Sequence, residues 1–338
     1  MDRNYSKLSF KDISYDVANL KEINFFCINR ILINLLRFFF THSLKDIYLK
    51  SLVETHSPKI IISNDREEYS FKIKNLCKNI FCITYQHSYY DDYDKKFLKE
   101  YLIGKTCDLF VTYHTQDTEF LSKIVKSEYI SLGSIKNNEI ILEKGISKEI
   151  PLLLISEFRE NAHELHTKKL IETCNYVKEF AKKKDMIPHV AVSANRADKD
   201  KYNLLNKELK FYKKYLDKFE WKNENSLITA NKTNLCICLH SNLGIELLSR
   251  GFKTIFLNLI GDVDKNQINP YLITKKPNYF LINCNKQEIN SKLEYYFNLS
   301  QSEWQNESDL SSNSIHFDEG NISFKKEIKK ILDNEKNK

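Results

Sequence analysis

Residues 235–256 read LCICLHSNLGIELLSRGFKTIF. The opening run LCICL is short and apolar, which predicts a buried strand. Ser241 or Asn242 can cap a helix that follows it. Gly251 is placed to end that helix, and a second apolar run comes after it. Strands that alternate with helices in this order pair into parallel sheets.

The same alternation extends over most of the chain. We expect strands at Lys59–Ser63, Ile80–Tyr85, Leu109–Tyr113 and Glu128–Leu132, and again at Leu152–Ile155, His189–Ser193, Leu235–Leu239 and Thr254–Leu257. Amphipathic segments such as Leu170–Lys183 and Leu204–Leu216 predict helices between the strands. A polar stretch, Ile135–Glu149, separates the two series and is followed by Pro151.

These patterns predict an α/β protein with two Rossmann-like domains, whose parallel sheets face each other across a cleft. The N-terminal domain is expected at 1–145. The C-terminal domain is expected at 146–338, with a terminal helix at Ile322–Asn334. Ligands in such folds bind beyond the carboxyl ends of the strands. Polar residues that directly follow a strand are therefore the candidates for function.

The composition excludes several classes of protein. The chain has 338 residues, of which 42% are hydrophobic and 29% charged, as in a globular protein with a sizeable core. It contains seven glycines and neither G-x-G-x-x-G nor G-x-x-x-x-G-K-[ST], which argues against a dinucleotide-binding Rossmann site and a P-loop NTPase. No G-x-S-x-G is present, which argues against an α/β-hydrolase.

Charge bears on the expected partners, and cysteine content together with the lack of a visible signal peptide predicts a cytoplasmic protein. The net charge of +7 is spread along the chain, so a nucleic-acid partner is not expected. The eight cysteines form no paired framework and no signal peptide is visible, which indicates a reducing compartment. No residue pattern predicts a metal site, and no cofactor is expected besides a nucleotide-linked substrate.

The most apolar stretch, Phe25–Phe40, is too short and too polar to span a bilayer. Its apolar spacing predicts a helix that faces the core. The alternative is a helix that lies on a membrane surface with Phe38–Phe40 inserted, which would make the protein peripheral to the inner membrane.

The turn after Leu239 has the chemistry of a phosphate site. The free backbone N–H groups at the start of the predicted helix, together with the helix dipole, favour an anion. Gly244 would allow close approach of the backbone, and Glu246 could accept hydrogen bonds from a ribose. The alternative is an ordinary strand, capped helix and strand with no ligand.

The run from His240 to Glu246, followed by Ser249-Arg250-Gly251-Phe252-Lys253, resembles the S-T-L-G-x-E-x-x-x-R-G-x-K segment of bacterial surface-carbohydrate biosynthesis proteins. Those proteins are glycosyltransferases, proven or presumed, of the GT-B fold, which act in lipopolysaccharide, O-antigen or capsule assembly. Tyr85-Gln86-His87 is similar to their Q-H-G element, and Leu132-Gly133-Ser134 to their G-S/N element. Here Asn242 stands in place of the usual Thr, and Ser88 in place of the Gly.

The resemblance implies that the C-terminal domain holds the nucleotide and the N-terminal domain holds the acceptor. Ser241 and Asn242 would then contact phosphate, His240 would flank the phosphate or nucleotide, and Glu246 would contact the ribose. The loops after two further strands should face the same ligand. These loops contain Ser156, Glu157 and Arg159, and Asn195 and Arg196. Either arginine could pair with phosphate oxygens.

Sugar transfer also requires a base that takes the proton of the acceptor hydroxyl. His87 is the first candidate because it ends a predicted strand. Asp91 and Asp92, in the adjacent Tyr-rich acidic stretch, are the competitors, and His87 can equally be a structural residue.

The sequence thus favours a metal-independent glycosyltransferase that moves a sugar from a nucleotide donor to a growing, lipid-linked surface glycan. A catalytically idle GT-B-like scaffold and a sugar-nucleotide epimerase are the alternatives. CMP-, UDP-, GDP- and CDP-linked donors all fit the motifs, which do not specify the sugar, the linkage, retention or inversion, or the oligomeric state.

Overall fold

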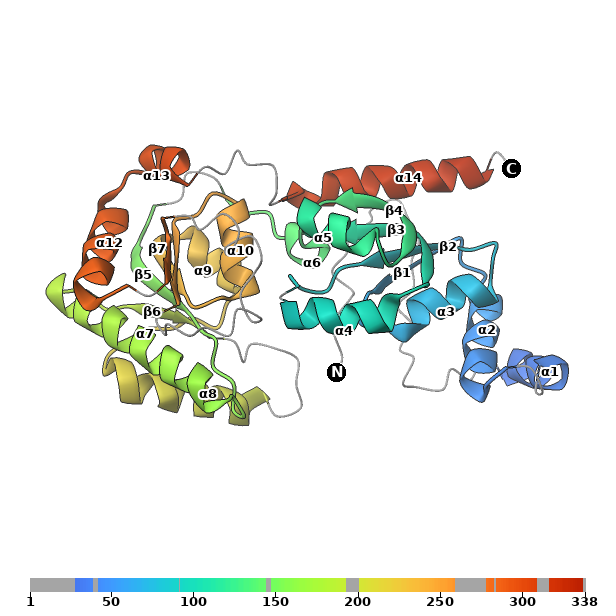
Figure 1. Cartoon of the computed structure of the whole chain (residues 1–338), viewed down its shortest axis with the longest axis horizontal. Helices are drawn as coiled ribbons and strands as arrows, with labels where there is room; N and C mark the ends of the chain where they lie inside the picture. The colour runs from blue at the N-terminus through green and yellow to red at the C-terminus, as the bar shows by residue number, and fades with distance from the viewer. Residues whose placement is uncertain are drawn as a thin grey trace. The chain divides into compact units, whose positions relative to one another are not determined.

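The computed structural model describes residues 28–38, 42–90, 92–143, 147–192, 201–258, 278–282, 284–308 and 316–336. These residues form two compact units (Figure 1). The N-terminal unit contains those within 28–89, 94–139 and 318–336, and the C-terminal unit contains those within 90–93 and 140–317.

The N-terminal unit is built on a parallel sheet. Its strands are β1 (Ile60–Asn64), β2 (Phe81–Tyr85), β3 (Thr106–Thr112) and β4 (Lys126–Ser131), and their order in the sheet is β1-β2-β3-β4. The helices that follow β1, β2 and β3 are α3 (Glu68–Leu76), α4 (Asp92–Leu102) and α5 (Thr115–Leu121). Because each strand is added on the same side of the last, right-handed crossovers place the connecting helices on one face.

Side chains on β3 identify that face. The Phe110 ring lies 6.5 Å from the Phe71 ring of α3, and the Thr112 hydroxyl lies 2.6 Å from that of Thr118 in α5. Leu109 and Val111 alternate with these residues and therefore point to the opposite face.

The terminal helix α14 (Ile322–Lys336) covers the opposite face (Figure 1). Its Phe324, Ile328 and Ile331 pack in one cluster with Leu109 and Val111. This differs from the expectation that the terminal helix belongs to the second domain. The crossover helices leave this face of the sheet uncovered, so burying it against α14 removes a large apolar area from water. The short α6 (Ile135–Asn138) and a 3₁₀ helix (Glu319–Asn321) adjoin it.

The C-terminal unit is built on a second parallel sheet. Its strands are β5 (Ile150–Ile155), β6 (His189–Ala191), β7 (Thr233–Cys238), β8 (Thr254–Asn258) and β9 (Phe280–Ile282), in the order β6-β5-β7-β8-β9. Both units thus confirm the predicted α/β fold with two Rossmann-like domains. Each expected strand is present, whereas the short β9 was not predicted.

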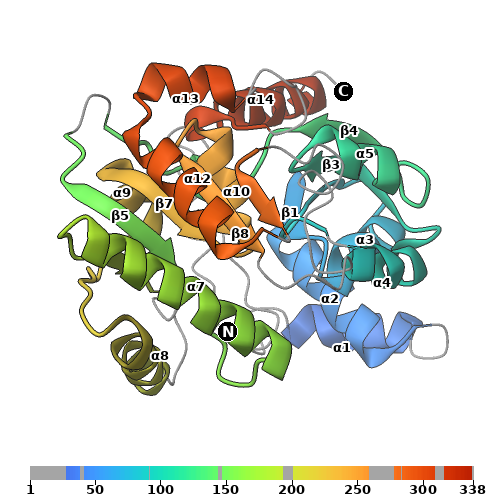
Figure 2. The same cartoon turned by 60° about the vertical axis from the view of Figure 1, so that its left-hand side comes forward.

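Helices cover both faces of this sheet. α7 (Glu164–Lys183) and α12 (Lys286–Asn298) lie on one face, and α9 (Ser226–Asn231) and α10 (Asn242–Ser249) lie on the other (Figures 1 and 2). α8 (Lys201–Leu216) packs beside α7, and α13 (Gln301–Glu307) follows α12.

Two further helices precede β1: α1 (Ile28–Phe38) and α2 (Leu44–His56), which contact each other. Ser43 caps α2 by accepting a hydrogen bond from the Asp46 N–H. None of the helices in the described ranges is both long enough and apolar enough to cross a bilayer.

Candidate functional site

The strand order of the C-terminal unit places a topological switch point between β5 and β7. From β5 the chain moves to β6 on one side, and from β7 it moves to β8 on the other. The two following loops therefore diverge toward opposite faces of the sheet. In doubly wound folds this is where ligands bind, outside the carboxyl ends of the strands.

The turn after β7 has the local structure that the sequence predicts. The Ser241 hydroxyl accepts a hydrogen bond from the Leu243 N–H at 3.2 Å and so caps α10. At the other end, Gly251 has φ +83°. The Gly251 and Phe252 N–H groups donate back to Leu248 and Leu247, which is the Schellman arrangement.

Glu157, which follows β5, binds the turn that follows β7. Its Oε1 accepts hydrogen bonds from three successive backbone N–H groups, those of Leu239, His240 and Ser241, at 2.8, 3.0 and 3.1 Å. Its Oε2 lies 3.6 Å from the His240 Nε2, and the side chain is buried. The turn is therefore an anion-binding nest, and the anion that it holds is a carboxylate of the protein itself.

This contact changes the role expected of Glu157. Its carboxylate binds the N–H groups that directly precede α10, because three convergent N–H dipoles stabilise a buried negative charge. What remains at the tip of α10 is the exposed Asn242 and the partly exposed side chains of His240 and Ser241. A ligand at this edge would meet those groups rather than the nest.

Two histidines and an arginine surround the nest. The His166 Nε2 donates to the Glu157 carbonyl at 2.8 Å, and its ring meets the His240 ring edge-on at 5.7 Å. Burial lowers the pKa of His166, with the nearby His240 and Arg159 adding to the effect. Arg159 is exposed and, together with His166 and Phe158, lines a hollow of about 100 Å³.

His166 was not predicted as a site residue. His163 caps α7 by accepting a hydrogen bond from the Leu165 N–H at 3.3 Å. The place of His166 in the first turn of a predicted helix could have indicated it. The first turn of a helix that follows a parallel strand lies at the carboxyl edge of the sheet.

Beneath the nest, Ser156 belongs to a buried polar network. Its hydroxyl donates to Glu208 and accepts hydrogen bonds from the Tyr212 hydroxyl at 2.8 Å and the Phe158 N–H at 3.3 Å. Glu208 and Tyr212 are fully buried. These bonds occupy the Ser156 hydroxyl within the protein, so we assign Ser156 to the support of the loop.

Gly244 and Glu246 lie in the buried part of α10. A Cβ on Gly244 would come 2.5 Å from the Cys238 Sγ and 2.9 Å from the Phe256 ring. A glycine is thus required at position 244 for the close packing of α10 on β7 and β8. This packing explains the glycine, and no ligand is needed to explain it.

We therefore expect Gly244→Ala to destabilise the C-terminal unit by about 1–3 kcal/mol, because the added methyl overpacks the helix–sheet contact. Urea denaturation followed by tryptophan fluorescence measures this loss, since Trp221 and Trp304 both lie in that unit. Asn242→Ala, at the exposed start of the same helix, is the control and should change stability by less than about 1 kcal/mol. Unchanged stability of Gly244→Ala would contradict the packing role.

The N-terminal unit has its own polar cluster, at the ends of β2 and β3. The loop Gln86-His87-Ser88 is held at successive backbone groups. The His87 N–H donates to the Asp65 Oδ1 at 3.0 Å, and its carbonyl accepts from the Tyr113 hydroxyl at 3.0 Å. The Gln86 amide donates to the Ser88 carbonyl at 2.7 Å. His87, which is half-buried, therefore sits on a loop with a fixed backbone.

Asp117 lies behind this loop and is fully buried. Its Oδ2 accepts a hydrogen bond from the Gln86 amide at 2.5 Å and lies 3.4 Å from the His114 Nε2. Burial raises the pKa of Asp117 to about 7, although the hydrogen bond from Gln86 opposes the shift.

Three predicted residues, Asp91, Asn195 and Arg196, lie outside the described residues. Asp92 begins α4.

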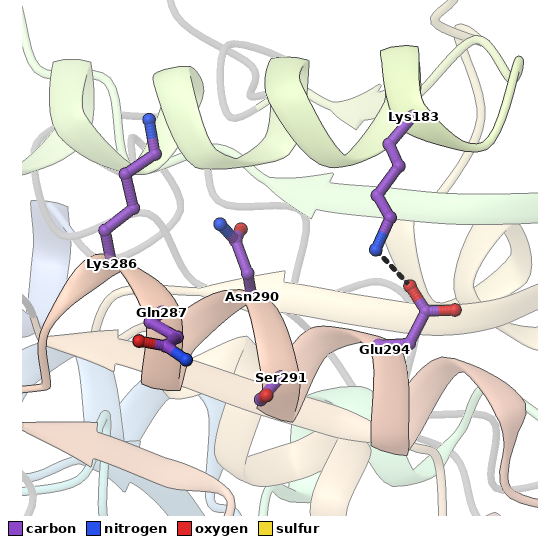
Figure 3. Close-up of a pocket in the computed structure, with 6 residues that line it drawn as sticks. All are labelled: Lys183, Lys286, Gln287, Asn290, Ser291 and Glu294. Atoms are coloured by element: carbon purple, nitrogen blue, oxygen red, sulfur yellow. Dashed lines mark hydrogen bonds and ion pairs between the residues drawn. The ribbon is translucent and has the colours of Figure 1, made fainter.

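A hollow of about 500 Å³ lies between α7 and α12 (Figure 3). It is lined by Lys183, Lys286, Gln287, Asn290, Ser291 and Glu294. Lys183 and Glu294 point toward each other in an ion pair of 3.2 Å. The lining of the hollow includes both Lys183, the last residue of α7, and Lys286, the first residue of α12. In the described ranges, no three His, Cys, Asp or Glu side chains come together as a metal site requires.

Comparison with solved structures shows the fold. S. aureus MnaA with UDP is 13% identical, with a TM-score of 0.50 over 92% of this chain and 80% of that one. UDP-GlcNAc 2-epimerase from Neisseria meningitidis bound to UDP-GlcNAc is 13% identical, with a TM-score of 0.48 over 90% and 89%. Acinetobacter baumannii MurG is 10% identical, with a TM-score of 0.46 over 85% and 77%. Curated protein sequences give no match.

The two Rossmann-like units give the chain the GT-B fold. A family model described as "putative O-antigen biosynthesis protein" matches residues 86–332, which is more than half of the chain. The chain belongs to this O-antigen biosynthesis family. The predicted resemblance to proteins of surface-carbohydrate biosynthesis is thereby confirmed.

Proposed function

We propose that the chain is a glycosyltransferase that binds a nucleotide-sugar donor at the carboxyl ends of β5 and β7. This proposal is supported most strongly by the groups that gather at the switch point. A rigid nest closed by Glu157 is surrounded by Arg159, His166 and His240 beside the start of α10. Arg159 is exposed and can compensate the charge of a diphosphate, and the partly exposed His240 and the exposed Asn242 can donate hydrogen bonds to it.

In the proposed reaction, an acceptor hydroxyl oxygen forms a bond to the anomeric carbon, and the bond from that carbon to the donor phosphate oxygen breaks. The nucleotide leaves with the bonding electrons, and the cationic groups near α10 stabilise its charge. The proton of the acceptor hydroxyl passes to a base. We assign that role to His87, because the hydrogen bonds around its backbone hold it at the carboxyl end of β2.

A panel of CMP, CDP, UDP, GDP and dTDP tests the donor site. One of these nucleotides should stabilise the protein, by about 2.7 kcal/mol at 100 times its Kd. Arg159→Ala should weaken that nucleotide about tenfold, because a charge-assisted bond to phosphate is lost. Lys286→Ala, in the hollow between α7 and α12, is the matched control and should bind normally. A nucleotide effect that survives Arg159→Ala and disappears in Lys286→Ala would place the donor elsewhere.

The fate of the donor nucleotide-sugar distinguishes a transferase from an epimerase and from a scaffold. A transferase hydrolyses the donor slowly alone and releases nucleotide faster with acceptor. An epimerase converts the donor sugar with no acceptor present, and a scaffold binds nucleotide without releasing it from the donor. Either of the last two results would contradict the proposal.

A further inference from the structure

The outward face of α1 carries three exposed aliphatic side chains beside the exposed Asn29, whereas the helix contacts α2 through buried polar side chains. The Asn34 amide is fully buried and donates to the Ser51 Oγ at 3.0 Å and the Glu54 Oε2 at 2.9 Å. On the other side of the helix, Leu32 is 56% exposed and Leu36 is 89% exposed. The sequence pattern had predicted that these leucines face the core. The hydrogen bonds of Asn34 instead fix a rotation that turns them outward.

The same face carries positive charge. Arg30 and Arg37 are exposed, and α1 contains no acidic residue. At 100° per residue, the two arginines lie along one border of the strip formed by Leu32, Ile33 and Leu36. A helix with an aliphatic strip bordered by long cationic side chains matches a membrane interface, where the strip enters the acyl region and the arginines reach lipid phosphates.

The small size of this helix face favours a lipid surface over a membrane-spanning role or a stable protein interface. The helix has 11 residues and is about 16 Å long, which is too short to span a bilayer. Three aliphatic side chains cover at most a few hundred Å², well below the roughly 800 Å² per partner of a stable protein interface. An interfacial helix needs no such area, because charge attraction adds to apolar insertion.

We propose that α1 binds the protein to an anionic lipid surface through Leu32, Ile33 and Leu36, with Arg30 and Arg37 on lipid phosphates. Phe38 is not part of this surface, because its ring lies 4.4 Å from the Lys50 Nζ and 5.2 Å from the His42 ring. Phe39 and Phe40 lie outside the described residues. This proposal is independent of the transferase reaction, since it concerns only where the protein binds.

Flotation of the full chain with vesicles tests the proposal. The probes are vesicles of phosphatidylcholine alone and of phosphatidylcholine with phosphatidylglycerol. We expect binding to the anionic vesicles only. Leu32→Gln with Leu36→Gln should weaken that binding about tenfold or more. Arg30→Gln with Arg37→Gln should weaken it to a similar extent and remove most of its salt dependence.

The matched control is Ile141→Gln with Ile187→Gln, which removes two other exposed isoleucines. It should bind as the wild type does, and an unchanged thermal melt should show that every variant is folded. Equal vesicle binding by wild type and the leucine variant would overturn the proposal, as would absence of wild-type binding. A dimer that dissociates in the leucine variant would also overturn it and would assign the face to a second copy of the chain.

Discussion

Replacing Glu157 by alanine is expected to lower the free energy of unfolding of the C-terminal unit by about 3–5 kcal/mol. The loss is large because one carboxylate oxygen serves the N–H groups of Leu239, His240 and Ser241. Without it, these donors face a buried site, and each unsatisfied buried donor costs about 1–3 kcal/mol. Water can reach the partly exposed end of the turn, which limits the total loss in the free energy of unfolding.

Urea denaturation followed by tryptophan fluorescence measures this effect in the C-terminal unit alone. Glu157→Gln should lose about half as much, since a neutral carbonyl oxygen still accepts hydrogen bonds but more weakly. Glu160→Ala is the matched control, because that carboxylate is exposed and pairs with Lys207 on the surface. It should change stability by less than about 1 kcal/mol. Equal effects of the Glu157 and Glu160 variants would show that the nest is not a structural element.

The second large effect concerns Asp117. Its pKa is raised from 3.8 to about 7, mainly by burial. The folded protein therefore holds this proton more tightly than the unfolded chain does. Stability should be highest near pH 4, fall as pH rises through the interval up to about 7, and then level off lower by about 3–4 kcal/mol.

Asp117→Asn should abolish that dependence. The asparagine is neutral at every pH, and its carbonyl can still accept the hydrogen bond from Gln86. At pH 8 the variant should exceed the wild type by about 3 kcal/mol, whereas near pH 4 the two should be similar. Thermal unfolding followed by circular dichroism reports this, because the N-terminal unit contains no tryptophan.

Glu119→Gln, an exposed carboxylate on the same helix, is the control and should follow the wild-type curve. Parallel curves for wild type and Asp117→Asn would contradict the account. They would mean that Asp117 is ionised throughout and is compensated by His114, whose Nε2 lies 3.4 Å from it.

The sequence predicted the fold well because its signals are local. Short apolar runs located every strand of the N-terminal sheet, and Ser241 and Gly251 located the ends of α10. The strand β9 was missed because three residues carry too little pattern. The terminal helix was assigned by its position in the chain, whereas its place depends on which sheet face the other helices leave uncovered.

The site was predictable only in part. Position after a strand made His240 and Arg159 candidates, and both lie near His166 because the topology of parallel sheets brings such residues to one edge. The bonding of Glu157 to the turn at Ser241 joins residues 84 positions apart, and no local pattern specifies it. The sequence predicted that Gly244 allows a close approach to the backbone. In the structure, the groups that approach it are Cys238 and Phe256.

We propose that the nucleotide-sugar donor binds at the switch point between β5 and β7. A crystal structure with the nucleotide that stabilises the protein tests it most directly. We expect phosphate oxygens within hydrogen-bond distance of Asn242 and Arg159, with the Glu157 carboxylate still bound to the N–H groups of the turn. A nucleotide bound away from the start of α10, for example in the hollow between α7 and α12, would contradict it.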